Sequence, residues 1–160
     1  MQAVLCRLLA RASGSAGMAG GQAIDLASVG VKLNESQLRE MHRLKTGALL
    51  QGSVLMGAAC GELTVAEREA LSTYGAAIGL AFQVVDDILD VTADSATLGK
   101  TAGKDAEQDK PTYVSILGLE RSRVYAQELL AQALAALDAS GLADTRALRA
   151  LAEMVVNRAS

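Results

Sequence analysis

Three aspartates at the end of a long apolar segment are the residues of this chain best suited to chemistry. Residues 82–90 contain Asp86, Asp87 and Asp90, and Gln83 stands one helical turn before them. Because a helix turns by about 100° per residue, Asp86 and Asp90 lie on one face with Asp87 beside them. Carboxylates so close repel one another unless a cation neutralises them, and oxygen ligands without His or Cys favour Mg²⁺ over Zn²⁺. Since Mg²⁺ binds one or two carboxylates together with substrate phosphate oxygens, the motif predicts a phosphorylated ligand.

A solvated helix end is the simpler interpretation of these aspartates, because acidic residues are common there. Carboxylates in the last turn, however, face the negative end of the helix dipole and lose free energy unless a cation compensates. An EF-hand is excluded, since the ligand spacing and the loop glycine of that motif are absent from the sequence. The cation-binding interpretation is therefore favoured.

A polar segment follows the aspartates directly. Over residues 92–111 the apolar period disappears, and Lys100, Lys104 and Lys110 stand among polar residues and glycines. Long polar loops are typical of lids, and lysines near an Mg²⁺ site are suited to closing over a diphosphate, although alone they would be ordinary surface charges. A nucleotide-binding P-loop is excluded, because Asp94 stands where that motif needs glycine and no strand precedes it.

A third polar group lies inside a helix expected over residues 35–60. Lys45 and Thr46 border a long uncharged segment, where most lysines simply extend to water. If this helix flanks the helix that carries the aspartates, Lys45 and the Thr46 hydroxyl point at the same phosphate. Gly47 and Gly52 would let the two helices approach closely.

The remaining polar residues carry weaker signals. Gln22 and Asp25 lie one helical turn apart and face either an interior polar site or solvent. His42 has no partner at metal or nucleophile spacing and is expected to be an exposed helical residue. The glycines within residues 13–21 form no dinucleotide-binding fingerprint, because no strand precedes them, and their three-residue spacing suits helix contact.

The elements that must position these residues are expected to be helical throughout. The chain has a single proline, is rich in Ala, Leu and Val, and shows helical periodicity of its apolar residues in nearly every window. Asn34 with Gln37, and Thr64 with Glu67, have the spacing of capping boxes that open two helices. Helices are expected over residues 35–60, 64–90, 113–119, 121–139 and 145–158, with a kink or close packing in residues 13–21 and a turn near Gly30.

The length and composition of the chain limit the classes of protein to which it can belong. The 160 residues, 51% of them apolar, suffice for one domain with no internal boundary, and a net charge of −3 offers no field for nucleic acid. The longest uncharged stretches, residues 46–61 and 70–85, have 16 residues each, short of the roughly 18 to 20 that span a bilayer. Residues 1–12 do not read as a secretory signal. Cys6 and Cys60 lie in apolar helical patterns and are expected to be reduced packing residues of a cytoplasmic protein.

Taken together, the motifs resemble those of a known family. Over nearly its full length the chain is similar to the short-chain isoprenyl diphosphate synthases, most of all the bacterial farnesyl diphosphate synthases. The matching segments occur in the family's order and spacing, and they are Gly20-Gly21-Gln22 with Asp25, Lys45-Thr46-Gly47-Ala48-Leu49, Gly79-Leu80-Ala81-Phe82-Gln83 with Asp86-Asp87-Ile88-Leu89-Asp90, Thr97-Leu98-Gly99-Lys100, and Asp109-Lys110-Pro111-Thr112-Tyr113.

The resemblance implies an all-α, isoprenoid-synthase-type helical bundle, a homodimer, and Mg²⁺-dependent condensation of an allylic diphosphate (dimethylallyl or geranyl) with isopentenyl diphosphate to give farnesyl diphosphate. The motif matched by Asp86, Asp87 and Asp90 binds Mg²⁺ on the allylic diphosphate in this family. Departure of the diphosphate develops negative charge, which metals and lysines stabilise.

The resemblance also assigns individual roles. The positions that contact the allylic diphosphate are matched by Lys45, Thr46, Gln83, Lys100 and Lys110. Of the matched residues, Lys45, Asp86 and Lys100 are expected to act in catalysis. Gln22, Asp25 and Lys104 are secondary candidates for the site.

One part of the family pattern has no match. The first aspartate-rich motif, its arginine pair and the residues that bind isopentenyl diphosphate are absent from these 160 residues. The sequence therefore resembles the C-terminal half of a family member, either a fragment, a truncated product or a chain whose other half is supplied by a second chain. Such a chain is expected to lack synthase activity alone and to associate through apolar faces that are core in the full bundle.

Two other functions compete with this interpretation. A terpene cyclase needs aromatic faces around its cations, and aromatic residues make up 2% of the chain. A non-catalytic helical subunit or partner of a prenyl diphosphate synthase is the remaining alternative. It predicts loss of the acidic and lysine motifs, whereas both are intact here.

Overall fold

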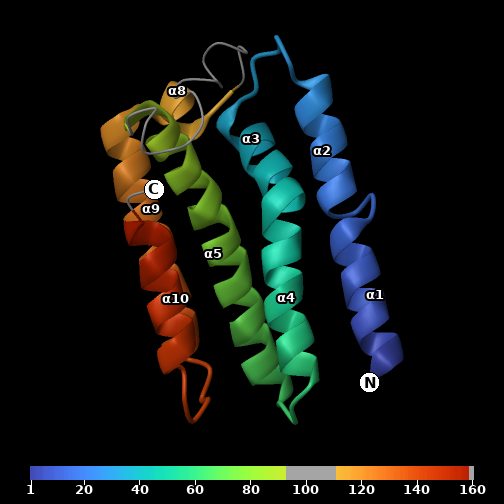
Figure 1. Cartoon of the computed structure of the whole chain (residues 1–160). Coiled ribbons are helices and arrows are strands. Elements are labelled where there is room, and N and C mark those ends of the chain that lie inside the picture. The colour runs from blue at the N-terminus through green and yellow to red at the C-terminus, as the bar shows by residue number, and fades with distance from the viewer. Residues whose placement is uncertain (93–110, 159–160) are drawn as a thin grey trace.

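The structure is a computed structural model, and it describes residues 1–92 and 111–158. The described residues form helices and contain no strand, which confirms the all-α prediction (Figure 1). In chain order the elements are α1 (Gln2–Ser13), α2 (Met18–Ala27), α3 (Glu35–His42), the π-helical turn η1 (Arg43–Gly47), α4 (Ala48–Ala59), α5 (Val65–Thr92), α8 (Tyr113–Leu117), α9 (Leu119–Asp138) and α10 (Arg146–Asn157).

Helix α5 lies at the centre of this arrangement. It packs against α9 and α10 on one side and against η1 and α4 on the other, while α1 lies along α4 and α2 lies against η1 (Figure 1). The uncharged stretch of α5, residues 70–85, accounts for its place, because side chains from Leu71 to Val85 are buried on more than one face. The aspartates follow at the end of this buried stretch, so the core fixes their position.

The predicted capping boxes open the two helices that matter for the site. The Asn34 side chain accepts the Gln37 backbone N–H at 2.9 Å, and the Gln37 side chain accepts the Asn34 N–H at 3.0 Å. Thr64 and Glu67 make the same reciprocal pair at the start of α5, at 3.2 and 2.7 Å. Each pair satisfies backbone donors that the helix itself leaves without a partner.

A π turn divides the helix that the sequence predicts over residues 35–60. Helix α3 ends at His42, η1 covers Arg43–Gly47, and α4 begins at Ala48. A π turn accommodates one extra residue and changes the faces on which neighbouring side chains lie. Lys45 and Thr46 both stand on this turn, so the irregular backbone determines where they point.

Close approach of η1 to α5 depends on two glycines. A Cβ built on Gly79 would lie 2.8 Å from the Cα of Gly47, a distance that real Cβ atoms do not reach. The prediction for Gly47 is thus confirmed. Gly52 contacts α1 instead, where an added Cβ would lie 2.9 Å from the Cβ of Ala12, so the prediction that it faces α5 is wrong.

The glycine-rich segment near the N-terminus is a break between helices. Helix α1 ends at Ser13 and α2 begins at Met18, so the chain bends here, in agreement with the expected kink. Gly17 packs on the end of α1 as predicted, because a Cβ on it would overlap the Ala12 carbonyl oxygen. Gly21 makes a further close contact, because any Cβ on it would overlap the backbone of Lys45 in η1. Packing of α2 on η1 therefore requires glycine at this position.

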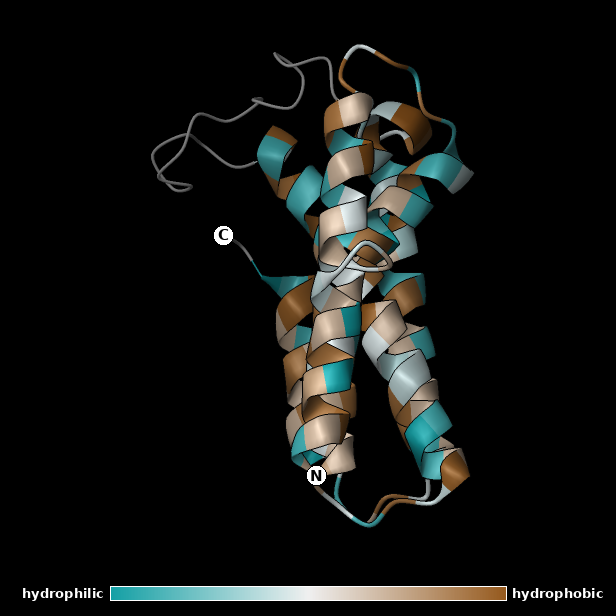
Figure 2. Ribbon diagram, turned by 90° about the vertical axis from the view of Figure 1, so that its right-hand side faces the viewer, coloured by the Kyte–Doolittle hydropathy of each residue, from teal (hydrophilic) through white to brown (hydrophobic). Residues whose placement is uncertain are grey.

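Polar and apolar residues are interspersed along the helices (Figure 2). Among the described residues, none of the helices combines the length and hydropathy needed to cross a membrane.

Cys6 and Cys60 are exposed, so the prediction that they pack in the core is wrong. Little of α1 is covered by other elements, since it buries only Ala12, and Cys60 is the C-cap residue of α4, beyond the packed part of that helix.

Candidate functional site

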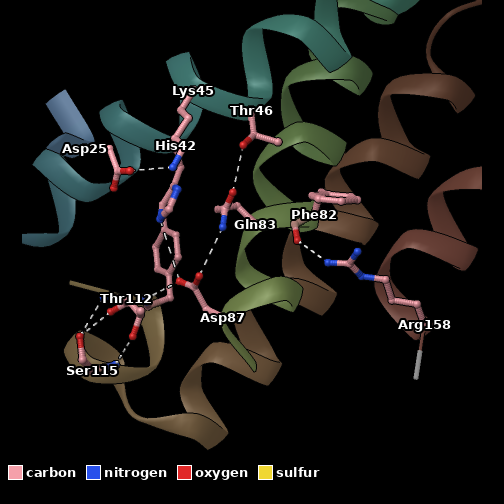
Figure 3. Close-up of polar contacts among 11 residues, drawn as sticks. Asp25, His42, Lys45, Thr46, Phe82, Gln83, Asp87, Thr112, Ser115 and Arg158 are labelled. Atoms are coloured by element: carbon pink, nitrogen blue, oxygen red, sulfur yellow. Dashed lines mark hydrogen bonds and ion pairs between the residues drawn. The ribbon is translucent and has the colours of Figure 1, made fainter. Parts of the chain in front are cut away.

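A chain of hydrogen bonds connects η1, α5 and α8 (Figure 3). The Thr46 hydroxyl donates to Gln83 Oε1 at 3.0 Å, and the Gln83 amide lies 3.4 Å from Asp87 Oδ1. The backbone N–H of Tyr113 donates to the other oxygen, Asp87 Oδ2, at 2.8 Å. The contact of η1 with α5 brings Thr46 to Gln83, two residues that the family resemblance assigns to the diphosphate site. Asp87 is therefore a buried acceptor that ties the start of α8 to α5.

Lys45 points from η1 toward α2. Its ammonium lies 2.7 Å from Asp25 Oδ2, with side-chain exposures of 33% and 11% respectively. The contact follows from the packing of Gly21 on the backbone of η1. Asp25 thus belongs to the interior polar site that the sequence left open, and Gln22 beside it is half-buried.

His42 is buried, contrary to the prediction that it is exposed. Its ring stacks on Tyr113, with centroids 5.7 Å apart, and Nε2 lies 4.0 Å from Asp87 Oδ2. Helix α8 covers the face of α3 that the local sequence leaves open to solvent. Burial, and after it the Lys45 charge, lower the pKa of His42 to about 4, against the opposing effect of Asp25. The imidazole is therefore neutral near pH 7.

Asp86 contacts a residue at the C-terminal end of the described chain. The Arg158 guanidinium donates to the Phe82 carbonyl at 2.9 Å and lies 3.4 Å from Asp86 Oδ1. The same guanidinium stacks over the Phe82 ring, 4.1 Å from its centroid. The Asp86 carboxylate remains 43% exposed, so it is accessible to a ligand.

The three aspartates therefore have different surroundings. Asp86 faces partly outward, whereas Asp87 and Asp90 are buried. Within residues 1–92 and 111–158 there is no group of three or more His, Cys, Asp or Glu placed to bind a metal ion. Their role as metal ligands remains a prediction.

The predicted lysines of the polar segment, Lys100, Lys104 and Lys110, lie outside the described residues.

Sequence reasoning missed two residues of this site. His42 stands one helical turn before Lys45, and that spacing indicates that the two side chains lie on the same helix face. Arg158 reaches Asp86 across 72 positions of sequence, and no local pattern indicates such a contact.

Comparison with known proteins decides the family. The Polyprenyl synthetase family model matches residues 3–152. The chain belongs to this family. A probable farnesyl diphosphate synthase of Bradyrhizobium diazoefficiens is 52% identical over 133 residues, which are 81% of this chain and 40% of that protein. The farnesyl diphosphate synthase of Escherichia coli is 46% identical over 153 residues, 94% of this chain and 51% of that protein.

The fold agrees with the family assignment. The solved structure of a geranyltransferase from Helicobacter pylori, complexed with magnesium and isoprenyl diphosphate, superimposes with a TM-score of 0.81 at 37% identity. It covers 97% of this chain and 50% of that one. The predicted isoprenoid-synthase-type helical fold is thereby confirmed. The chain spans about half the length of the curated relatives it matches.

Proposed function

We propose that this chain supplies the allylic-diphosphate side of the active site of a prenyltransferase of the farnesyl diphosphate synthase type. The reaction condenses an allylic diphosphate with isopentenyl diphosphate. The observation that carries the proposal is the contact of Thr46 with Gln83 at 3.0 Å. It aligns the π turn that bears Lys45 with the helix that bears Asp86, so cationic, hydroxyl, amide and carboxylate groups come from two adjoining elements.

Lys45, Thr46 and Gln83 have the chemistry to bind a diphosphate. The Lys45 ammonium has three N–H donors, and its contact with Asp25 uses one of them. With a third of its side chain exposed, the ammonium has donors available for phosphate oxygens. The Thr46 hydroxyl and the Gln83 amide can add neutral donors, so the three residues bind and orient the leaving group.

Magnesium fits the donor set of α5 as part of a complex with the diphosphate. The aspartates are hard oxygen donors, and Asp86 is accessible. Because Mg²⁺ takes one or two protein carboxylates and completes its shell with phosphate and water oxygens, a closed protein cage is not needed. Asp86 would bind the ion, with Asp90 the next carboxylate along that face. The ion, when bound, supplies positive charge to the departing diphosphate.

The chain's own residues then contribute through position and charge. Lys45 stabilises the negative charge that develops as the carbon–oxygen bond of the allylic diphosphate breaks. The hydrogen bond between Asp87 and Tyr113 fixes the start of α8, directly after the segment that carries Lys100 and Lys110. No side-chain nucleophile is required.

The remaining half of the synthase pattern, including the first aspartate-rich motif and an isopentenyl diphosphate site, would come from the other part of a longer protein or from another chain. We propose that the 160-residue chain alone binds the allylic diphosphate with Mg²⁺ but does not condense it. Farnesyl diphosphate as product, a homodimer as assembly and the cytoplasm as location belong to the same proposal.

Calorimetry tests the binding half of this function. We expect the chain to bind geranyl S-thiolodiphosphate, an unreactive allylic analogue, when Mg²⁺ is present. Asp86→Asn should weaken that binding about tenfold or more, because the accessible carboxylate is lost. Glu153→Gln, which removes an exposed carboxylate of α10, is the matched control and should bind as the unaltered chain does. Equal affinity for all three proteins would exclude Asp86 from the site.

A further inference from the structure

His42 is a buried polar group that the proposed function leaves without a role. The residue is 5% exposed, and within the described ranges neither ring nitrogen has a hydrogen-bond partner. A buried polar group without a hydrogen bond costs about 1–3 kcal/mol. A neutral imidazole has one N–H donor, and Nε2 of His42 lies near a buried carboxylate.

That carboxylate is Asp87. Its Oδ2 lies 4.0 Å from His42 Nε2, beyond the roughly 3.2 Å limit of an N–H···O bond. An approach of about 1 Å would therefore complete a hydrogen bond. Stacking on Tyr113 orients the imidazole ring, and the Tyr113 N–H fixes the facing oxygen at 2.8 Å.

The contact of Gln83 with Asp87 is the weakest step in the hydrogen-bond chain. At 3.4 Å it is longer than the 3.0 Å bond from Thr46 and the 2.8 Å bond from Tyr113. In the proposed function the Gln83 amide donates to the diphosphate. Binding would thus remove one donor from a carboxylate that is 3% exposed. A replacement donor would offset this loss.

We propose that His42 is a positioning residue for Asp87. When Gln83 turns its amide to a bound diphosphate, His42 donates from Nε2 to the Asp87 carboxylate. The exchange keeps Asp87, and through it the backbone of Tyr113 and the start of α8, in place. This inference rests on the proposed function, because it requires that Gln83 contact the diphosphate.

The chain offers a direct reporter of this exchange, since His42 is its one histidine. Labelling the imidazole with ¹⁵N gives one pair of ring resonances, whose shifts report the tautomer and hydrogen bonding. As geranyl S-thiolodiphosphate and Mg²⁺ are added at neutral pH, we expect the Nε2–H tautomer to become dominant and the exchange of its proton with water to slow. The change should follow the binding isotherm measured by calorimetry.

The two measurements separate this inference from the proposed function. Heat of binding without a change at His42 overturns the role of His42 and leaves the proposed function standing. Absence of binding heat from the unaltered chain overturns the proposed function, and the inference with it.

Two variants test the role through affinity. His42→Phe keeps an aromatic ring against Tyr113 but has no donor, and it should bind the analogue about tenfold more weakly. His42→Gln places an amide N–H near the position of Nε2 and should restore most of the affinity. Binding of the Phe variant at full strength would overturn the proposal. If that variant does not fold, the ¹⁵N resonances of the unaltered chain decide the question.

Discussion

Gly79 of α5 lies so close to Gly47 of η1 that a Cβ on Gly79 would be 2.8 Å from the Gly47 Cα. The obstacle is backbone, which cannot turn aside as a flexible side chain can. This contact sets the separation of the two elements that carry Thr46 and Gln83. The site therefore depends on two residues that have no functional group of their own.

Gly79→Ala should destabilise the chain even though alanine is the better helix former. Alanine gains about 1 kcal/mol of helix propensity, but the overlap with the η1 backbone costs roughly 1–3 kcal/mol and pushes the elements apart. Urea unfolding measures the balance. Gly57→Ala is the matched control, because a Cβ at that position of α4 meets nothing within 4 Å and should stabilise the chain. An equal increase in the free energy of unfolding of both variants would show that the close contact does not matter.

His42 should make the stability depend on pH below neutrality. Its pKa is about 4 in the folded chain, below its ordinary value of 6.5. As the pH falls through that interval the unfolded state binds a proton and the folded state does not, so the free energy of unfolding decreases. The loss approaches about 3 kcal/mol near pH 4 and then levels off.

The comparison that isolates this effect uses His42→Gln, which cannot titrate. Urea unfolding of both proteins between pH 7 and pH 4 should show a steeper decline for the unaltered chain, because the carboxylates titrate equally in the two. Parallel curves would contradict the buried, neutral state of the imidazole.

The ion pair of Lys45 with Asp25 should stabilise the fold more than the surface ion pairs do. Its side chains are 33% and 11% exposed, so removing Lys45 leaves a carboxylate largely shielded from water. We expect Lys45→Met to lower the free energy of unfolding by about 1–3 kcal/mol. A double-mutant cycle with Asp25→Asn should give a coupling above that of Arg121 and Glu128, a pair whose side chains are 49% and 51% exposed. Similar couplings for the two pairs would place Lys45 in effectively aqueous surroundings.

Local patterns in the sequence predicted much of what positions the site. Both capping boxes formed as expected, since the residues that make them are three positions apart and need no tertiary context. The close packing of η1 on α5 at Gly47 was also predicted, because a glycine facing the uncharged stretch of α5 favours it. These features depend on spacing within one or two helices.

The features that escaped prediction depend on distant segments. His42 is buried because α8, about 70 positions later, covers it, and the π turn that follows it has no simple sequence signature. The exposure of Cys6 follows from how little of α1 is covered, a property of its neighbours rather than of its own pattern. Apolar periodicity indicates which face of a helix can be buried, but not which faces are.

Arg158 should compete with magnesium for Asp86. Its guanidinium lies 3.4 Å from Asp86 Oδ1 and is anchored by the Phe82 carbonyl and ring. Replacing Arg158 with Gln removes a positive charge beside the accessible carboxylate, so Mg²⁺ affinity without diphosphate should rise about two- to fivefold, a modest effect because the carboxylate is partly solvated. Calorimetric titration with MgCl₂ measures the change, and Arg123→Gln on the exposed face of α9 controls for net charge. Weaker Mg²⁺ binding by Arg158→Gln would instead mean that the guanidinium orients the Asp86 carboxylate for the ion.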